Sequence, residues 1–474
     1  MRFPRISASS RWLFIPLCLI GACLLTMPTS TYAQCNTGSS ATGFNAIYGN
    51  CGGSTNTQAA FTMVDVTQYT TSGDICQRIN AVLANYNGSA PGGVVVDARG
   101  YNPGSSSQAC SMNPWNLATE PPSSVVLLPS GTISITSNWK LPKNARLIGE
   151  GPGNTILAVN TGVGGFTDDG SGAMIEMGTS SICGTILDCP GISIEHLALN
   201  GNNVSAIKYG ILNLYAQELS QVDDVAISYI TGATIGTGIS IQMLTAANSG
   251  AYTNLKMSNV KTCVSITSTS GPPPSPVYDT RGIHGLNCSI VSTGGPAISL
   301  DSPNSSLEDI FITGSTSQDG IAIGVNQSAP NNILFNIGGS GLGKLIHLSN
   351  ATNTVTPPSC TPYTTGSTST TYNVCNTTIL GAVNSGGTYT IADDLTGTDL
   401  TDTTVGVYIL GETVPAANNS VGYSRFTTSS SQPTWLVGSS TPSGTCKAGQ
   451  IYSSTSGTNT IYGCQGSGGW AVIF

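Results

Sequence analysis

The densest group of residues that could do chemistry lies in a short segment that follows a proline-rich stretch. It contains Asp279, Arg281 and His284. His284 or Arg281 could take or give a proton, while Asp279 orients it or binds a cation. An ion pair between Asp279 and Arg281 would explain the same residues without catalysis, since structural ion pairs also perturb pKa values. Both interpretations stay open, and we favour the structural one.

A second candidate is the acid pair Asp223-Asp224. Two suitably spaced carboxylates can act as general acid and as the base that activates water. Similar pairs, Glu195-His196 and Glu308-Asp309, occupy the same place in neighbouring segments, however. Short polar side chains at a repeated turn bond to the backbone and to their copies above and below. We therefore favour a ladder of turn residues over a catalytic pair.

The segments that must position these residues form a degenerate repeat between Ile192 and Ile379. Each copy has an apolar residue, one or two polar residues and then alternating aliphatic residues, and a second short strand follows most copies. Such a unit cannot bury its inner face alone, so successive units must stack as coils. The positions that we take as equivalent are His196, Asp224, Asn254, Asn287, Asp309 and Asn332.

A helix is expected before the first strands. Asp74 can cap it, Gln77 stands at the capping-box position, and the apolar residues from Ile75 to Leu83 fall on one face. A Gly92-Gly93 turn and strands separated by Pro and Gly residues follow. The order of these elements predicts an N-terminal helix followed by an all-β fold.

This opening resembles that of the pectate-lyase-like superfamily. The resemblance runs from about Asp74 to Gly201 and includes Leu128-Pro129-Ser130-Gly131-Thr132 and Leu147-Ile148-Gly149. It implies a right-handed parallel β-helix whose first helix caps the open end of the solenoid. The superfamily includes lyases, hydrolases, epimerases and non-catalytic adhesins, so the resemblance is specific for the fold and not for one activity.

The resemblance also suggests two known mechanisms. Polygalacturonases use neighbouring acids such as Asp223-Asp224, but their other signatures (Asn-Thr-Asp, Gly-His-Gly and Arg-Ile-Lys) are not found. Pectate lyases use Ca²⁺ held by clustered carboxylates and an arginine base. Asp223, Asp224 and Asp301 could share a face for this purpose, with Lys256, Lys261 or Arg281 opposite. The segment from Asp168 to Gly172 resembles half of a calcium loop, although ordinary turns have the same composition.

The predicted domains are a signal peptide (1–33), an N-terminal segment with the capping helix (34–120), a parallel β-helix (121–384) and a C-terminal β-rich tail with a disulfide-closed hairpin (385–474). Three arginines precede an apolar run from Trp12 to Leu25, and small residues end the segment at Ala33. A lipoprotein signal ending at Cys23 ranks second. No other stretch is long and apolar enough for a membrane span, so we expect a secreted protein, with the periplasm or cell surface as alternatives.

Twelve of the 14 cysteines lie beyond the predicted signal peptide. In an exported chain, and without the close spacing of zinc ligands, they predict disulfides. Pairing of sequence neighbours gives Cys35/Cys51, Cys76/Cys110, Cys183/Cys189, Cys263/Cys288, Cys360/Cys375 and Cys446/Cys464.

Charged residues make up 8% of the chain, and the net charge is −8. No basic cluster could neutralise phosphates, which argues against nucleic acid as a partner. Aromatic rings beside Asn, Ser and Thr suit uncharged glycans, although rings more often cover strand edges. The candidates for a sugar-stacking face are Trp115, Trp139, Tyr209, Tyr215, Tyr229 and Tyr252, and in the tail Trp435, Tyr452, Tyr462 and Trp470.

The predicted function is that of a secreted, polysaccharide-directed protein, either a carbohydrate-active enzyme of the lyase or glycoside hydrolase type or a non-catalytic adhesin that binds glycans on a surface or in a matrix. Its expected partner is a polysaccharide or a cell-surface glycan. The tail leaves open whether the chain assembles into trimers.

Overall fold

The computed structural model describes residues 62–348 apart from 70–71, 87–92, 102–106, 118–122, 163–164, 168, 184–188, 217–218, 244–249, 269–281, 326–328 and 330; it also describes 364–365, 368–369, 377–393, 408–413, 435–438, 441–442, 451–454, 461–464 and 469–472. The predicted signal peptide and the pairs Cys35/Cys51 and Cys360/Cys375 lie outside these residues. No described helix is long and apolar enough to cross a membrane.

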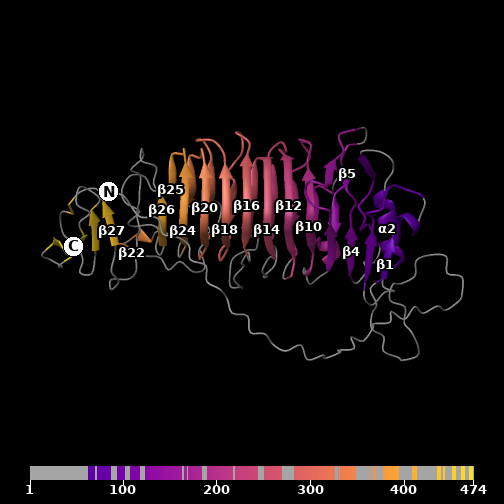
Figure 1. Ribbon diagram of the computed structural model, residues 1–474, viewed down its shortest axis with the longest axis horizontal. Helices are drawn as coiled ribbons and strands as arrows, with labels where there is room; N and C mark the ends of the chain where they lie inside the picture. The colour runs from indigo at the N-terminus through magenta and orange to yellow at the C-terminus, as the bar shows by residue number, and fades with distance from the viewer. Residues whose placement is uncertain are drawn as a thin grey trace, which may run out of the picture. The chain divides into compact units, whose positions relative to one another are not determined.

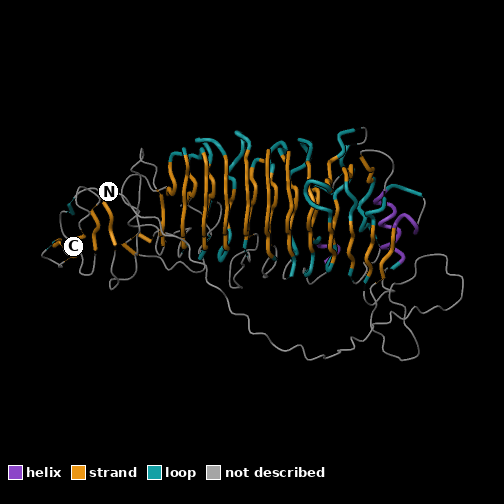
Figure 2. The backbone as a smooth tube through the Cα atoms, in the orientation of Figure 1, coloured by secondary structure: helices purple, strands orange, loops and turns teal. Residues whose placement is uncertain are grey.

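Two parallel sheets form the body of the fold, and Figures 1 and 2 show their strands side by side. The fifteen-stranded sheet contains β1 (Thr62–Asp65), β2 (Val94–Asp97), β3 (Ser107–Cys110), β4 (Ser124–Leu127), β5 (Gly131–Ile135), β7 (Ala145–Ile148), β8 (Thr155–Val159), β10 (Ser193–Asn200), β12 (Gln221–Ile230), β14 (Ala251–Val260), β16 (Ile283–Ile290), β18 (Ser306–Thr313), β20 (Ile333–Ser340), β24 (Thr378–Ser385) and β26 (Tyr408–Thr413). The nine-stranded sheet contains β6 (Trp139–Leu141), β9 (Ala173–Met177), β11 (Tyr209–Asn213), β13 (Thr237–Met243), β15 (Thr262–Ser268), β17 (Ile298–Asp301), β19 (Asp319–Ile323), β21 (Lys344–Leu348) and β25 (Tyr389–Asp393).

The chain alternates between the two sheets, so each coil adds one strand to each of them from β9 to β26. Crossover connections between parallel strands are right-handed in nearly all proteins. The predicted right-handed parallel β-helix is confirmed.

Stacked aliphatic side chains fill the space between the sheets. Ile211, Ile239, Val264 and Ile298 lie in register on successive strands of the nine-stranded sheet, and each is at most 1% exposed. The column continues through Ile321 and Ile346. Since parallel strands lie about 4.8 Å apart, each side chain contacts its copies directly above and below. The core is therefore a set of columns, one for each inward position.

A left-handed residue bends most long strands at the same place. The column consists of His196, Asp224, Asn254, Gly285, Asp309, Asn336 and Gly381, with φ between 51° and 73°. Gly, and less often Asn, Asp and His, adopt this conformation. The predicted equivalence of Asn287 and Asn332 was wrong: Gly285 and Asn336 occupy those places. Asn287 instead pairs with Lys256 and Phe311 beyond the bend, and Asn332 is buried before β20, where it bonds to Ser305 and Ala329.

The predicted capping helix is confirmed as α2 (Ile75–Asn85), at the β1 end of the stack (Figure 1). The Asp74 carboxylate accepts from the Gln77 backbone N–H, and the Gln77 side chain accepts from the Asp74 N–H, both at 3.0 Å. Ile75, Ile79, Val82 and Leu83 are buried. Two single-turn helices, α1 (Val66–Tyr69) and α3 (Ser180–Cys183), also occur.

Three predicted disulfides are present. Cys76–Cys110 joins α2 to β3, Cys183–Cys189 closes a short loop, and Cys263–Cys288 joins β15 to β16. Cys464 is also disulfide-bonded, but Cys446 lies outside the described residues.

Parallel strands extend past both limits of the predicted range 121–384. Strands β1 to β3 precede it, and β25 and β26 follow it as further members of the two sheets. These strands have no polar residue at a left-handed bend, which is the feature that marks the repeat in the sequence. A short hairpin, β22 (Thr364–Thr365) and β23 (Thr368–Ser369), lies between β21 and β24 in the chain.

A separate four-stranded sheet contains the C-terminal segments. It consists of β27 (Trp435–Gly438), β28 (Ile451–Ser454), β29 (Ile461–Cys464) and β30 (Trp470–Val472), with the last three antiparallel. The ring of Tyr452 packs edge-on against Tyr462 and Trp470, with centroids 6.2 and 5.7 Å apart.

Gly285 offers a test of the left-handed column. A Cβ built on Gly285 meets no atom closer than 3.6 Å, so there is space for a side chain. The cost of substitution comes instead from the backbone, whose φ of 73° is unfavourable for residues other than glycine. We expect Gly285→Ala to lower the free energy of unfolding by about 1–2 kcal/mol, while Gly285→Asn costs less because asparagine already occupies this position in β14 and β20. Urea unfolding of both variants measures the difference. Equal losses for Ala and Asn would contradict the backbone explanation.

Candidate functional site

Three of the five predicted site residues lie on the outer face of the fifteen-stranded sheet. Asp223 pairs in register with Thr253, which pairs with His284, so one strand separates the two candidates. Two strand spacings place their backbones about 10 Å apart. Asp224 is the left-handed residue next to Asp223. Asp279 and Arg281 lie outside the described residues.

We call the polar residues at and just before the bend the bend row. It consists of Glu195-His196, Asp223-Asp224, Thr253-Asn254, His284-Gly285, Glu308-Asp309 and Asn336.

Members of the bend row bond to one another across neighbouring coils. Asp224 accepts from His196 on one side, at 2.9 Å, while Asp223 accepts from Thr253 and from the Asn254 amide on the other side, the latter at 2.9 Å. Asp223 and Asp224 thus belong to two different contacts instead of forming one acid pair.

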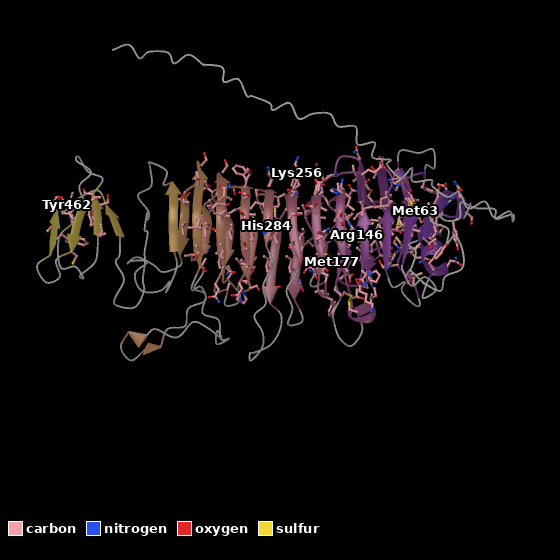
Figure 3. All side chains as sticks on the ribbon, turned by 60° about the horizontal axis from the view of Figure 1, so that its bottom comes forward. Met63, Arg146, Met177, Lys256, His284 and Tyr462 are labelled. Carbon is pink, nitrogen blue, oxygen red and sulfur yellow. A yellow bond between two sulfur atoms is a disulfide. The ribbon has the colours of Figure 1, made fainter. Side chains whose placement is uncertain are left out.

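The row contains two exposed pairs of a histidine and an acid. His196 Nδ1 lies 2.9 Å from Asp224 Oδ2, and His284 Nδ1 lies 2.8 Å from Glu308 Oε2. The side chains of the second pair are 39% and 38% exposed. A carboxylate at Nδ1 orients the ring and leaves Nε2 as the nitrogen that can exchange a proton with a bound molecule. Figure 3 labels His284 on its strand.

Glycine makes room for the His284 ring. A Cβ built on Gly282 would come within 2.2 Å of His284 Nε2. Gly282 directly follows the segment that holds Asp279 and Arg281. Gly282, at the end of this sequence cluster, therefore lies next to the His284 imidazole.

The start of the bend row is locked rather than exposed. Glu195 accepts from Arg146 Nη2 at 2.8 Å and from Gln221 at 3.1 Å, and it also accepts from Ser193. Burial alone would raise the pKa of Glu195, but these hydrogen bonds outweigh it and lower the pKa. With its side chain 10% exposed, Glu195 is a structural anchor.

Beyond the bend, short hydroxyl side chains form a second row. We call it the hydroxyl row: Ser228, Ser258, Ser289, Thr313, Ser340 and Ser385 lie in register on six successive strands. All six are partly or fully exposed. Beside them run Lys256, Asn287 and Phe311, also in register.

Two aromatic side chains that are not among the predicted sugar-stacking residues are exposed on this face. Phe311 and Phe335 are 46% and 45% exposed on adjacent strands. A Cβ on Gly338, the register partner of Phe311, would come within 2.8 Å of the Phe311 ring, so the ring lies over this glycine.

The predicted sugar-stacking role of Trp115, Trp139 and Tyr252 was wrong. Trp115 and Trp139 are at most 1% exposed and pack edge to face, with centroids 6.2 Å apart. Tyr252 is 1% exposed, and its hydroxyl bonds to Asn213 at 2.7 Å. Burial of these large rings contributes to the core. Of the candidates in the β-helix, Tyr229 is 41% exposed.

The predicted calcium ligands do not come together. Asp301 is fully buried in the nine-stranded sheet, where it accepts from Ser299, whereas Asp223 and Asp224 lie on the other sheet. Lys261 donates to the backbone of Gly232 and Ala233 instead of facing the acids. Within the described ranges, no three His, Cys, Asp or Glu side chains are grouped so that they could hold a metal ion.

Sequence reasoning missed a charged cluster on the nine-stranded sheet. Lys140 and Glu176 are register partners on β6 and β9, and Lys140 Nζ lies 2.7 Å from Asp169 Oδ2. Glu176 is 2% exposed and accepts from Asn138 at 2.5 Å and Ser171 at 2.8 Å. A lone charge in each of two short apolar strands was the available signal.

The pKa values of the two acids of this cluster are shifted in opposite directions. Burial raises the pKa of Glu176 above its ordinary value. Burial acts in the same direction on Asp169, but hydrogen bonds from Lys140 and Ser171 outweigh it and lower the pKa to about 2. Such divergence is typical of functional sites and also of structural ion pairs.

A third histidine forms another cluster that the sequence did not single out. His347 Nδ1 lies 2.6 Å from Asp319 Oδ2, and Lys344 Nζ lies 3.1 Å from His347 Nε2. Asp319 and Lys344 line a cavity of about 310 Å³. His347 is 12% exposed at its side chain, so its neighbours present the cluster to solvent.

No protein-family model and no curated protein matches the chain. Among solved structures, it is similar to ORF18 of Geobacillus virus E2 (14% identity, TM-score 0.40), covering 71% of this chain and 62% of the viral protein. It is also similar to the A-module of the mannuronan C-5 epimerase AlgE4 from Azotobacter vinelandii (14% identity, TM-score 0.33), covering 74% of this chain and 96% of the module. A third similarity is to DFA-IIIase from Arthrobacter chlorophenolicus A6 (12% identity, TM-score 0.29), covering 74% and 94% of the two chains. The chain thus spans less than two thirds of the viral protein.

Because the pKa of Glu176 is raised and that of Asp169 is lowered, substitutions of the two acids should change the melting temperature with opposite pH dependence. A raised pKa in the folded state means that Glu176 favours folding below its unfolded pKa and loses this contribution as pH rises through the folded value. Glu176→Gln keeps an acceptor for Asn138 and Ser171, so we expect a higher melting temperature than wild type at pH 8 and no difference at pH 4.

The matched variant Asp169→Asn should behave in the reverse way. The lowered pKa of Asp169 stabilises the fold above pH 4, and this contribution is lost as pH falls towards 2. Its melting temperature should lie below that of wild type at pH 7 and converge with it near pH 2. Parallel pH profiles for the two variants would contradict these assignments.

Proposed function

We propose that this chain is a polysaccharide-directed protein whose working surface is the outer face of the fifteen-stranded sheet between β12 and β24. The observation that carries the proposal is the hydroxyl row. It offers six hydroxyl groups in register at a spacing of about 4.8 Å. A sugar polymer also repeats its hydroxyl groups along one direction, so one surface can bond to several units of a chain.

The neighbouring rows supply the other groups that glycan binding uses. Phe311 and Phe335 offer exposed ring faces for the apolar side of a sugar. Asn287 and Lys256, beside the hydroxyl row, are exposed and offer an amide and an ammonium group. Specificity would come from these few groups, since the hydroxyl row itself is uniform.

In the catalytic form of the proposal, His284 transfers the proton. Glu308 holds Nδ1, and Nε2 then takes a proton from the sugar in a lyase reaction or exchanges one with water or the leaving oxygen in a hydrolase reaction. The candidates for the second group are Asp223, which is separated from His284 by one strand, and Asp279 and Arg281, before Gly282. Asp224 would hold His196 in the same way. Ca²⁺ stays a prediction that only a chelator test addresses.

A non-catalytic glycan-binding or adhesin-like role is the second candidate. It is favoured by the bonding of Asp223, Asp224 and Glu308 to neighbours within the bend row, because a side chain held by the fold is less free to react. The hydroxyl row and the two phenylalanines would serve this role unchanged.

Export is part of the proposal. The three disulfides suit an oxidising compartment, in which such bonds persist. The signal peptide and any assembly into trimers stay predictions.

Turnover on pectin, polygalacturonate, β-glucans and xylan, with and without chelator, tests the catalytic form. Where turnover occurs, His284→Ala should lower kcat about 10²–10⁴-fold, as loss of a general acid or base does. Glu308→Gln should lower it less, and Ser265→Ala, on the nine-stranded sheet, should leave it unchanged. A variant His284→Ala with wild-type kcat would remove His284 from the mechanism.

Retention on insoluble glycans decides between the two roles. Binding without turnover, lost on replacing both Phe311 and Phe335 by Ala, supports the non-catalytic role. Neither turnover nor retention on any of the polymers would overturn the proposal.

A further inference from the structure

A polar cavity of about 430 Å³ lies beside the capping helix, away from the fifteen-stranded face between β12 and β24. Its lining includes Asn113, Asn116, Ser137, Asn138, Lys140 and Thr167. Ligand pockets for small molecules typically have volumes of about 300–1,000 Å³. Short amide and hydroxyl side chains dominate this wall, and Met112 is the one apolar side chain among the described residues that line it.

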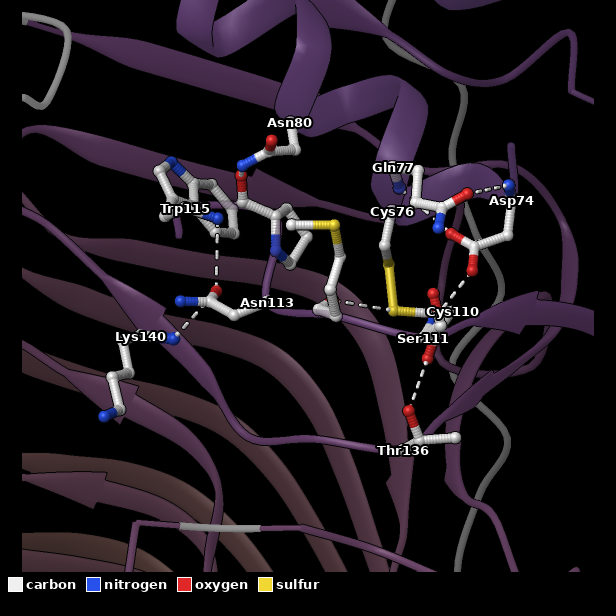
Figure 4. Close-up of a disulfide and its surroundings, with 12 residues drawn as sticks. Asp74, Cys76, Gln77, Asn80, Cys110, Ser111, Asn113, Trp115, Thr136 and Lys140 are labelled. Carbon is white, nitrogen blue, oxygen red and sulfur yellow. Dashed lines mark hydrogen bonds between the residues drawn. A yellow bond between two sulfur atoms is a disulfide. The ribbon is translucent and has the colours of Figure 1, made fainter. Parts of the chain in front are cut away.

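The wall is held rigidly by the cap. The Cys76–Cys110 disulfide ties β3 to α2, and the Ser111 N–H donates to the Asp74 carboxylate at 2.8 Å (Figure 4). Asn80 on α2 donates to the carbonyl groups of Pro114 and Asn116, at 2.9 and 3.2 Å. A site whose backbone is already ordered loses little conformational entropy when a ligand binds.

Several polar atoms of this wall have no bond within the described part of the chain. The Asn113 carbonyl oxygen accepts from the backbone N–H groups of Trp115 and Lys140, which leaves its amide N–H₂ as a donor. The Asn138 N–H₂ donates to Asp169 and Glu176, which leaves its oxygen as an acceptor. The Asn116 side-chain amide makes no hydrogen bond to another described residue, and Ser137 Oγ is buried without a partner among these residues.

The charges at the cavity are compensated. Lys140 Nζ is 2.7 Å from the Asp169 carboxylate, and its strand neighbour Glu176 lies behind Asn138. No uncompensated positive charge is therefore offered to an anionic ligand. Both donors and acceptors remain on the wall of this one cavity, and this suits a neutral molecule that carries several hydroxyl groups.

We propose that this cavity is a binding site for a neutral sugar, either a monosaccharide or the end unit of an oligosaccharide, recognised by the amides of Asn113, Asn116 and Asn138. The site is distinct from the polymer surface of the fifteen-stranded sheet, and none of the observations behind it depends on the proposed function. There the charges of Lys140 and Asp169 compensate each other. Glu176 accepts from the Asn138 N–H₂ group, so that the Asn138 side-chain oxygen faces the ligand.

Calorimetric titration of the full chain tests the site. The probes are the methyl glycosides of glucose, galactose, mannose and xylose, their disaccharides, and glucuronate and galacturonate as charged counterparts. At least one neutral probe should bind with a Kd in the millimolar range or below, and more tightly than the uronates. Absence of binding by every neutral probe up to about 50 mM, a concentration far above that range, or tighter binding of a uronate, would overturn the proposal.

Two substitutions locate the binding. Asn116→Ala removes a side chain that the fold does not use, and loss of its hydrogen bonds should weaken binding about three- to tenfold. Thr167→Trp, at an exposed position on the rim, should fill the cavity and abolish binding without loss of the fold. Ser265→Ala is the control and should leave binding unchanged. Neutral-sugar binding that survives both Asn116→Ala and Thr167→Trp would overturn the site.

The outcome is independent of the polymer assays. Phe311 and Phe335 do not line this cavity, so replacing them should leave the titration unchanged. If the wild-type chain shows neither turnover nor polymer retention but binds the neutral sugar, only the proposed function is contradicted. If it acts on or is retained by a polymer but binds no neutral sugar, only this site is contradicted.

Discussion

Register between neighbouring coils governs the arrangement of every other feature in this chain. Side chains on a strand alternate between two faces, so a slip of one residue would turn an entire inner column outwards. Columns such as the one through Ile211, Ile239 and Val264 resist this slip because each member is buried against its copies. The left-handed residue adds a second marker, since it must stand at the same place in each coil for the strands to remain paired through the bend.

This constraint explains why polar residues recur where they do. A position with φ near 55° selects Asn, Asp, His or Gly on backbone grounds, before any chemistry is considered. Once selected, the side chains lie one strand spacing apart and bond to one another, as His196 does to Asp224 and Asn336 does to Asp309. Functional groups in such a fold are therefore found where a row changes character. His284 and the pair of exposed phenylalanines are such changes, whereas Glu195 is a locked member of the same row.

The two sheets present different surfaces. The outer face of the fifteen-stranded sheet is long and repetitive, which suits an extended polymer. The nine-stranded sheet instead carries two small groups of charged residues, around Glu176 and around His347, each near a cavity. Lys140 of the group at Glu176 shares a cavity wall with Asn116, whose carbonyl group is bonded to Asn80 of the capping helix. The buried rings of Trp115 and Trp139 pack against each other. The cap thus closes the core and also shapes a pocket.

Local patterns determined much of this protein. The capping box at Asp74 and Gln77 and the parallel coils followed from the sequence, because each depends on short-range geometry or on a repeating alternation of apolar residues. The pairing of Cys76, Cys183 and Cys263 with their next cysteines was one of several connectivities that the sequence permits, and the structure selected it. Tertiary structure decided which residues share a row. Gly285 takes the place expected for Asn287 because loops of different length change the spacing between coils. A comparison of polar residues also cannot detect a glycine at the equivalent position. Tertiary structure also buried Trp115 and Trp139, which the sequence offered as candidates for a sugar-stacking face, and it assembled Lys140, Asp169 and Glu176 from three segments with no common motif. Contacts between coils depend on the cumulative register of the whole stack, and no local pattern contains that information.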